Sequence, residues 1–287
     1  TELQKAPAAN LSNTLGGRLP GISAVQSSGE PGYDGSAIRI RGTNSLGNSN
    51  ALIVVDGVPN RSGGLDRINP ADIESISVLK DAASTAIYGA RGSNGVVLIT
   101  TKSAKEGKTS LNVSIDYGIQ NVPDSRKTKV LNGKDFAQFK KEVFIGRFVL
   151  ANKRQPSTEE IPIDFRNPED TKYSTNWFDL ILHNNAPYKD INLTLSSGKG
   201  PVKSVISVGY YKEDGALKYT DYDRASVRTN LFGDINKFIT IGANIAGSYS
   251  RSSLASTDGR NAQVGLTLIA DPRYPAYDEK GELDRKS

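Results

Sequence analysis

The sequence predicts a chain of two parts. Residues 1–105 are expected to form an α/β region, and residues 106–287 the first strands of a large antiparallel transmembrane β-barrel. The first part mixes short helical and strand-like segments with turns, whereas the second shows long alternation of apolar and polar residues. No apolar stretch approaches the roughly 20 residues that a membrane helix needs, so a membrane location would depend on strands, which are short and half polar.

The α/β region is predicted element by element. Residues 10–19 are expected to form a helix, with Ser12 as its N-cap and Gly21 just past its end. Residues 81–88 form a second predicted helix, which opens at Asp81 and ends at a glycine. Strand-like runs occupy residues 22–26, 37–41, 51–56, 73–79 and 95–101. The last of these, GVVLITT, is continuously apolar, as expected for a strand covered on both faces.

From residue 108 onward, apolar and polar residues alternate strictly. In residues 111–119 the odd positions are apolar or aromatic and the even positions are polar or glycine. The same period returns in residues 191–196, 206–210, 225–231 and 239–249. A period of two places each apolar set on one face of a sheet and each polar set on the other.

A soluble β-sandwich produces the same alternation, and the pattern alone favours it. Three details favour a membrane barrel instead: the polar face is mostly small and uncharged, aromatic residues lie toward strand ends, and long links alternate with short ones. The longest predicted link covers about residues 121–188, and a medium one covers 212–224. About five strands cannot close a barrel, because two edges would be left unpaired in lipid. The chain is therefore expected to be the front portion of a longer barrel.

Composition excludes several kinds of chemistry. The chain of 287 residues has no cysteine and a single histidine, His183. The lack of cysteine excludes a disulfide scaffold, thiolate-bound zinc, iron–sulfur clusters and a cysteine nucleophile. The net charge of +5 is small and the basic residues are spread along the chain, so no nucleic-acid partner is expected. We expect no metal site, no cofactor and no enzymatic activity, since no nucleophile stands with a base in a recognisable order.

Four ordered segments resemble the plug domain of SusC/RagA-type TonB-linked outer-membrane transporters. They are residues 38–42 (IRIRG), 54–59 (VVDGVP), 68–81 (INPADIESISVLKD) and 82–102 (AASTAIYGARGSNGVVLITTK). A looser similarity continues through residues 177–181, 207–217 (SVGYYKEDGAL) and 224–231. Any one of these segments alone is weak, but four in order within one stretch are specific.

The resemblance implies a globular plug seated inside a barrel of about 22 strands. It also implies TonB-dependent import of a large nutrient, an oligosaccharide or a peptide, across the bacterial outer membrane. The implied partners are TonB with its inner-membrane energising complex, a SusD-like surface lipoprotein, the transported substrate and outer-membrane lipids. The family places a TonB box upstream of the plug, and the printed sequence begins too late to show one.

Candidate site residues follow from this resemblance and from the residue types. A plug must stay in place at rest and yield when pulled. Ion pairs across a hydrated interface suit this, because each is weak and can be replaced by another. The residues expected to make such ionic contacts with the barrel are Arg39, Arg41, Glu74 and Arg91. Substrate-facing plug loops are expected to present Asn44, Ser45, Asn48, Asn60 and Arg61. An aromatic platform for a glycan is expected among Tyr173, Trp177 and Tyr219. For each set, ordinary surface charge or packing is the competing interpretation.

Two other functions compete with import. One is a soluble β-rich carbohydrate-binding or adhesin module with an α/β cap. The other is a hydrolase that uses the α/β region, for which the sequence offers no nucleophile paired with a base. The arrangement of the apolar strand faces discriminates between the first alternative and import, because a soluble module must pack those faces into a closed core.

Overall fold

The computed structural model of the chain describes residues 10–16, 19, 21–40, 42, 48–59, 65, 68–236, 238–255 and 262–278. The chain divides into two compact units, Thr1–Asn121 with Asn185–Leu254, and Val122–Asn184 with Ala255–Ser287. The first unit contains both an α/β region and five long strands, so the boundary predicted at residue 105 lies within it.

The α/β region begins with a short helix and a two-stranded sheet. Helix α1 spans Leu11–Leu15, and strands β1 (Ile22–Gln26) and β2 (Ser36–Ile40) pair antiparallel. The predicted N-cap was wrong: the Asn10 side chain caps the helix by accepting a hydrogen bond from the Ser12 backbone N–H at 3.0 Å. The helix is also shorter than predicted, because the chain becomes extended at Gly16.

A four-stranded mixed sheet forms the centre of this region. Its strands are β3 (Leu52–Val55), β4 (Val58–Pro59), β5 (Ile73–Leu79) and β6 (Val96–Thr101), in the order β4-β3-β6-β5, with β3 parallel to β6. Strand β6 is central, and Val96, Val97 and Ile99 are at most 1% exposed, as predicted for its apolar run. The hydrophobic core joins these strands to α1 through Leu11 and Leu15.

The second predicted helix is interrupted. Helix α2 covers only Ala82–Thr85, and a 3-10 segment, η3, follows over Ala86–Gly92. Within η3, Gly89 has φ +57° and ψ −146°, a conformation that L side chains rarely adopt, so the chain turns at the glycine that was predicted to end the helix. Asp81 precedes α2 as predicted, but its side chain makes no cap hydrogen bond.

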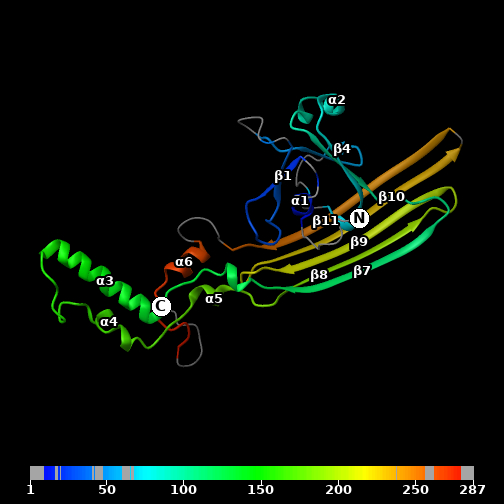
Figure 1. The fold of residues 1–287 in the computed structure, drawn as a ribbon. Coiled ribbons are helices and arrows are strands. Elements are labelled where there is room, and N and C mark those ends of the chain that lie inside the picture. The colour runs from blue at the N-terminus through cyan, green and yellow to red at the C-terminus, as the bar shows by residue number, and fades with distance from the viewer. Residues whose placement is uncertain are drawn as a thin grey trace. The chain divides into compact units, whose positions relative to one another are not determined.

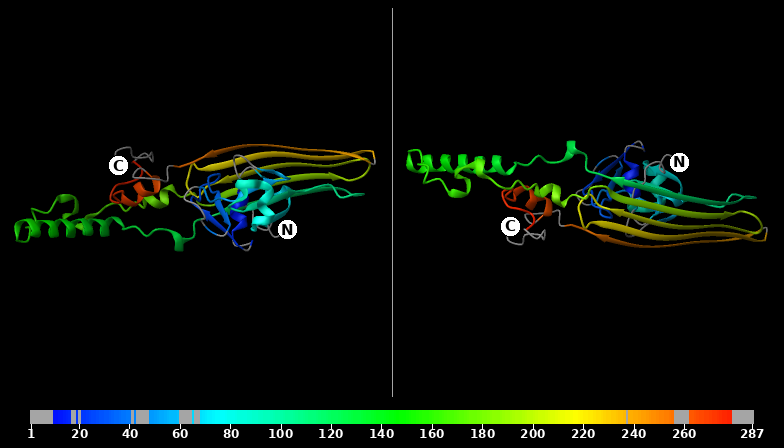
Figure 2. Two further views of the ribbon diagram at one scale, coloured as in Figure 1. Left: turned by 90° about the horizontal axis from the view of Figure 1, so that it is seen from above. Right: turned by 90° about the horizontal axis from the view of Figure 1, so that it is seen from below.

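Five long strands form a separate antiparallel sheet in the order β11-β10-β9-β8-β7. They are β7 (Thr109–Gln120), β8 (Ala186–Ser197), β9 (Val202–Asp214), β10 (Asp221–Asn236) and β11 (Ile239–Ser253). Figures 1 and 2 show them side by side as one curved layer, with the α/β region against one face. The predicted medium link shrinks to residues 215–220, because β9 and β10 extend beyond their alternating segments.

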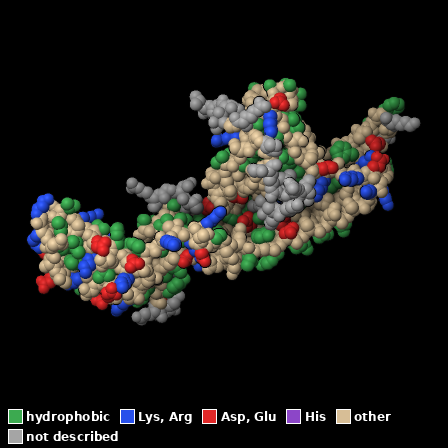
Figure 3. Space-filling view, in the orientation of Figure 1, with side chains coloured by type: hydrophobic (Ala, Val, Ile, Leu, Met, Phe, Trp, Pro, Cys, Tyr) green, Lys and Arg blue, Asp and Glu red, His purple; other side chains and the backbone are tan. Residues whose placement is uncertain are grey.

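The register confirms the two predicted faces of this sheet. Apolar residues such as Leu111, Leu193 and Val208 share one face, and their side chains are 61%, 40% and 49% exposed. Hydrophobic side chains appear along the lower side of the sheet in Figure 3. The opposite face carries the polar residues and meets the α/β region. The soluble alternative predicted a closed apolar core in these strands, and in the described residues the apolar face is uncovered.

The second compact unit contains most of the link between β7 and β8, together with residues near the C-terminus. Its helices are α3 (Gly133–Asn152), α4 (Ile163–Arg166), α5 (Trp177–Ile181) and α6 (Gln263–Ile269). Helix α3 begins where Asn132 and Asp135 exchange hydrogen bonds of 2.8 Å, and it ends at Lys153 in the left-handed conformation. Among the described residues, no helix is both long enough and apolar enough to cross a bilayer.

Candidate functional site

The candidate site is the contact between the α/β region and the polar face of the five-stranded sheet. Both belong to the same compact unit. The two parts approach closely at Gly209 of β9, where any side chain would overlap the Asn69 amide. The Asn69 amide nitrogen donates to the Asn192 side-chain oxygen of β8 at 2.6 Å.

The centre of this interface is an arginine between two carboxylates. Arg228 projects from β10, with Nη1 3.5 Å from Asp56 Oδ2 and Nε 3.5 Å from Asp72 Oδ2. The three side chains are only 12%, 14% and 5% exposed. Both contacts are ion pairs, and the one with Asp56 is also a long, weak hydrogen bond. We call Asp56, Asp72 and Arg228 the interface triad.

The Asp56 carboxylate is held firmly within the α/β region. It sits in the turn between β3 and β4, with φ +48°. Its Oδ1 accepts from the Thr101 backbone N–H at 2.8 Å, and its Oδ2 accepts from the Thr101 hydroxyl at 2.7 Å. Asp56 therefore presents a pre-positioned negative charge to Arg228.

The Asp72 carboxylate is held less completely. It ends a short 3-10 helix, η2 (Pro70–Asp72), and burial raises its pKa above the ordinary value. A hydrogen bond with Ser207 and the positive charges of Arg228, Lys102 and Arg224 oppose that rise. Within the described residues, Asp72 Oδ1 and Arg228 Nε have no hydrogen-bond partner that meets the geometric criteria. The triad therefore contains buried charge that is only partly satisfied.

A second polar connection lies one step along β10. The Asn230 side-chain amide donates to the Thr101 hydroxyl and to the Lys102 carbonyl, both at 2.9 Å. Because the Thr101 hydroxyl in turn donates to Asp56, the connection is continuous with the triad. Strand β10 thus contacts the α/β region through both ion pairs and hydrogen bonds.

An aromatic contact lies at the other end of the interface. The rings of Tyr211 and Tyr222 are buried, with centroids 6.2 Å apart, and Arg224 lies 5.8 Å from the Tyr211 ring. Any side chain at Gly32, whose φ is +76°, would overlap the Tyr222 ring. This glycine therefore permits the loop before β2 to approach the sheet.

The predicted ionic residues are placed elsewhere. Arg39 is half-buried on β2, between the buried residues Ile38 and Ile40, while Glu74 on β5 and Arg91 on η3 are exposed. None of the three forms an ion pair with the five strands within the described residues. Their contact with a complete barrel stays a prediction. Outside the described residues lie Arg41, Asn44, Ser45, Asn60 and Arg61.

The remaining predicted residues occupy varied settings. Asn48 is exposed, and its carbonyl accepts from the Asn94 side chain at 2.8 Å. Trp177 opens α5 and donates its ring N–H to the Asp271 carbonyl at 2.9 Å, and its place in an aromatic platform stays a prediction. Tyr173 is 49% exposed in the same compact unit, and Tyr219 is 93% exposed in the other.

Sequence reasoning placed Arg228 and Asn230 on the polar face but did not identify the triad. The available signal was Arg228 itself, a charge on a face made mostly of small uncharged residues. Asp56 and Asp72 lie inside two of the segments that carry the family resemblance. The part of the chain that the structure describes contains no cluster of metal-ligating side chains.

Comparisons with known proteins identify both parts of this interface. Residues 1–96 match the family described as TonB-dependent Receptor Plug Domain. The chain is 32% identical over 288 residues to TonB-dependent receptor SusC of Bacteroides thetaiotaomicron, covering 96% of this chain and 26% of SusC. It is also 32% identical over 285 residues to TonB-dependent receptor P26 of Formosa agariphila, covering 97% of this chain and 26% of that protein.

Solved structures agree with these sequence matches. The RagAB peptide importer in its closed-closed state superposes with a TM-score of 0.77 at 28% identity, covering 98% of this chain and 33% of that one. The chain thus spans about a quarter of the length of the curated relatives it matches. The relatives are receptors, which agrees with the expectation that the chain is not an enzyme. The chain therefore belongs to the TonB-dependent receptors of SusC/RagA type, and it comprises their plug domain and a five-stranded sheet that matches the start of the barrel.

Proposed function

We propose that the receptor containing this chain imports a large nutrient, an oligosaccharide or a peptide, across the bacterial outer membrane. TonB supplies the force, and the plug gates the barrel lumen. The single observation that carries this proposal is the polar contact between plug and wall, centred on the interface triad. It lies on the face of the sheet opposite to the uncovered apolar residues, as a lumen does.

The chemistry of the triad suits a plug that is held at rest and released under load. Burying charge costs desolvation energy, and pairing at 3.5 Å offsets only part of that cost. Such a contact fixes the position of the plug while contributing modest net stability. A directed pull can therefore separate the two surfaces without disrupting the hydrophobic core that holds the plug together.

We further propose TonB and a SusD-like surface lipoprotein as partners, and the lipids of the outer membrane as surroundings. The uncovered apolar face of the sheet supports contact with lipid. We propose that the plug covers residues 1–105 and that the barrel portion covers residues 106–287, with an extracellular loop near residues 121–188.

Energy-dependent uptake in the native host tests the proposal. Cells with the intact receptor should accumulate labelled nutrient when TonB is present and should only bind it at the surface when TonB is deleted. Uptake that continues at the same rate without TonB would contradict the proposal. Gel mobility that changes on heating would independently report a barrel in the complete receptor.

A further inference from the structure

A gap of about 690 Å³ opens between the plug and the first strands of the sheet, at the end where the chain passes from one to the other. The plug side contributes Ile73, Glu74 and Lys102, and the wall side contributes polar residues of β7 and β8. Both sides belong to the same compact unit. The volume lies in the range of ordinary ligand pockets.

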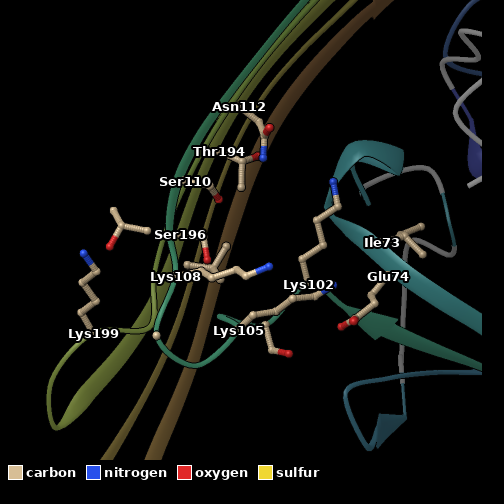
Figure 4. Close-up of a pocket in the computed structure, with 14 residues that line it drawn as sticks. Ile73, Glu74, Lys102, Lys105, Lys108, Ser110, Asn112, Thr194, Ser196 and Lys199 are labelled. Carbon is tan, nitrogen blue, oxygen red and sulfur yellow. The ribbon is translucent and has the colours of Figure 1, made fainter.

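Positive charge dominates this gap. Four lysines line it against one glutamate, and they are Lys102, Lys105, Lys108 and Lys199. Within the described residues, none of the four forms an ion pair within 4.0 Å, and Lys102 acts on Asp72 only through its longer-range positive charge. Figure 4 shows the ammonium ends of Lys102 and Lys108 reaching from opposite sides into the space between plug and sheet. The result is an electropositive gap, which we call the lysine gap.

The wall of the lysine gap adds neutral hydrogen-bonding groups. They are the side chains of Ser110, Asn112, Thr194 and Ser196. Within the described part of the chain these four side chains form no hydrogen bond with protein, so they are available to a ligand. Hydroxyl and amide groups beside ammonium groups suit an anion that carries oxygen atoms.

The backbone positions these lysines. The Gly107 N–H donates to the Gly198 carbonyl at 3.0 Å, and the Gly198 N–H donates to the Lys108 carbonyl at 2.7 Å. A side chain at Gly198 would overlap the Lys105 carbonyl, so the turn after β8 packs tightly on the segment that enters β7. The lysines of this segment therefore extend from a fixed base although their side chains are exposed.

We propose that the lysine gap binds carboxylate groups of an acidic cargo as it passes between plug and wall, an inference that rests on the import function proposed above. Lysines act as point charges without the fixed fork of arginine, and exposed ion pairs contribute little each. Several weak contacts of this kind suit an oligomer that carries several carboxylates and is released again. They do not suit tight binding of a single anion. Acidic side chains of a peptide and uronic acids of an oligosaccharide share this chemistry.

Binding to the detergent-purified complete receptor tests the inference. The probes are hexaglutamate and hexagalacturonate, with hexaglutamine and a neutral galactose hexamer as uncharged matches. The test variant is Lys105→Gln with Lys108→Gln. The control variant is Lys129→Gln with Lys172→Gln, which removes the same charge from exposed positions outside the gap. We expect the test variant to weaken binding of an acidic probe about fivefold, and the control to change it less than twofold.

A residue-level readout shows where the probe binds. The bound acidic probe should protect Lys105 and Lys108 from acylation by an amine reagent, as read by peptide mass spectrometry, and should leave Lys129 and Lys172 reactive. Protection by only one of the two acidic probes identifies the cargo as peptide or glycan. Binding that is equal in both variants, protection confined to other lysines, or no difference between acidic and neutral probes would overturn the inference. TonB-dependent uptake of the native nutrient is measured separately, so its failure is distinguishable from failure of the lysine gap.

Discussion

The plug and the five-stranded sheet use apolar residues in opposite ways. In the plug, apolar side chains from α1, β2, β3, β5 and β6 converge on one buried core. In the sheet, apolar side chains of comparable number lie uncovered on one face, while the other face is polar and partly buried. The plug therefore carries its own hydrophobic stabilisation, whereas the sheet depends on a surrounding apolar phase and on further strands.

The contact between the two regions differs in composition from the plug core and from the outer face of the sheet. It is built mainly from carboxylates, amides, hydroxyls and arginines, with a buried tyrosine pair at one end, and Arg228 and Asn230 come from a single strand. A hydrophobic interface of similar area would fuse the plug to the wall. A polar one positions the plug and still permits separation, because water can replace each lost hydrogen bond.

Removal of the interface arginine should have the largest effect. Arg228→Ala leaves two buried carboxylates without their cation, and we expect the plug to lose about 3–5 kcal/mol of stability in the receptor. A urea titration, read from a fluorophore on Ile87→Cys at the exposed surface of the plug, measures this loss. Addition of Asp72→Asn should restore part of the stability by neutralising one of the two charges.

Arg147→Ala provides the matched control for Arg228. This arginine is exposed on α3 and forms no ion pair within the described residues. A loss of stability as large as that from Arg228→Ala would show that arginine deletion in general, and not the triad, is responsible.

An isoleucine-to-alanine substitution made once in the plug core and once on the uncovered face compares how much stability an apolar side chain contributes at each place. Ile99→Ala removes a side chain that is 1% exposed in the plug core and should cost about 2–5 kcal/mol. Ile115→Ala removes one that is 69% exposed on the outer face of β7, and its cost should be much smaller. Urea titration with reporters in the plug and in the sheet measures both, and equal costs would contradict the comparison.

Deletion of the second polar connection should have a moderate effect. Asn230→Ala removes two hydrogen bonds and leaves the Lys102 carbonyl without this donor, so we expect a loss of about 1–3 kcal/mol. Asn244→Ala is the control, since Asn244 is the register partner of Asn230 on β11 and its side chain is exposed. Plug stability that responds equally to both changes would argue against the specific connection.

The smallest predicted effect is a pH dependence carried by Asp72. Burial raises the pKa of this carboxyl above its ordinary value of 3.8, so the folded plug takes up a proton more readily than the unfolded chain. The stability that Asp72 contributes is therefore fully present below the unfolded pKa and is lost as pH rises through the raised folded pKa. The difference in stability between wild type and Asp72→Asn, measured in urea from about pH 4 to neutral, should shift in favour of Asp72→Asn as pH rises. A difference that stays constant, or shifts the other way, would contradict this assignment.

Local pattern predicted some elements well and others poorly. Strands β1 and β5 have the predicted limits, because apolar and β-branched residues bounded by turns leave little choice of register. The predicted helix over residues 81–88 is α-helical only over Ala82–Thr85 and continues as a 3-10 segment from Ala86, while Gly89 has the positive φ of a residue that ends a helix, as predicted. The Asn10 cap was missed because Asn10 and Ser12 are equally good caps by residue type.

The sequence by itself determined the alternation of the sheet, the separation of its apolar and polar residues onto two faces, and the family of the plug, because periodicity and ordered motifs depend only on neighbours along the chain. Tertiary structure decided which charges meet. Arg228 is distant in sequence from Asp56 and Asp72, and only the seating of the plug against β10 brings its guanidinium to 3.5 Å from each carboxylate. Pattern reveals the face on which a side chain lies, whereas the partner on that face is set by long-range packing and by the energy of burying charge.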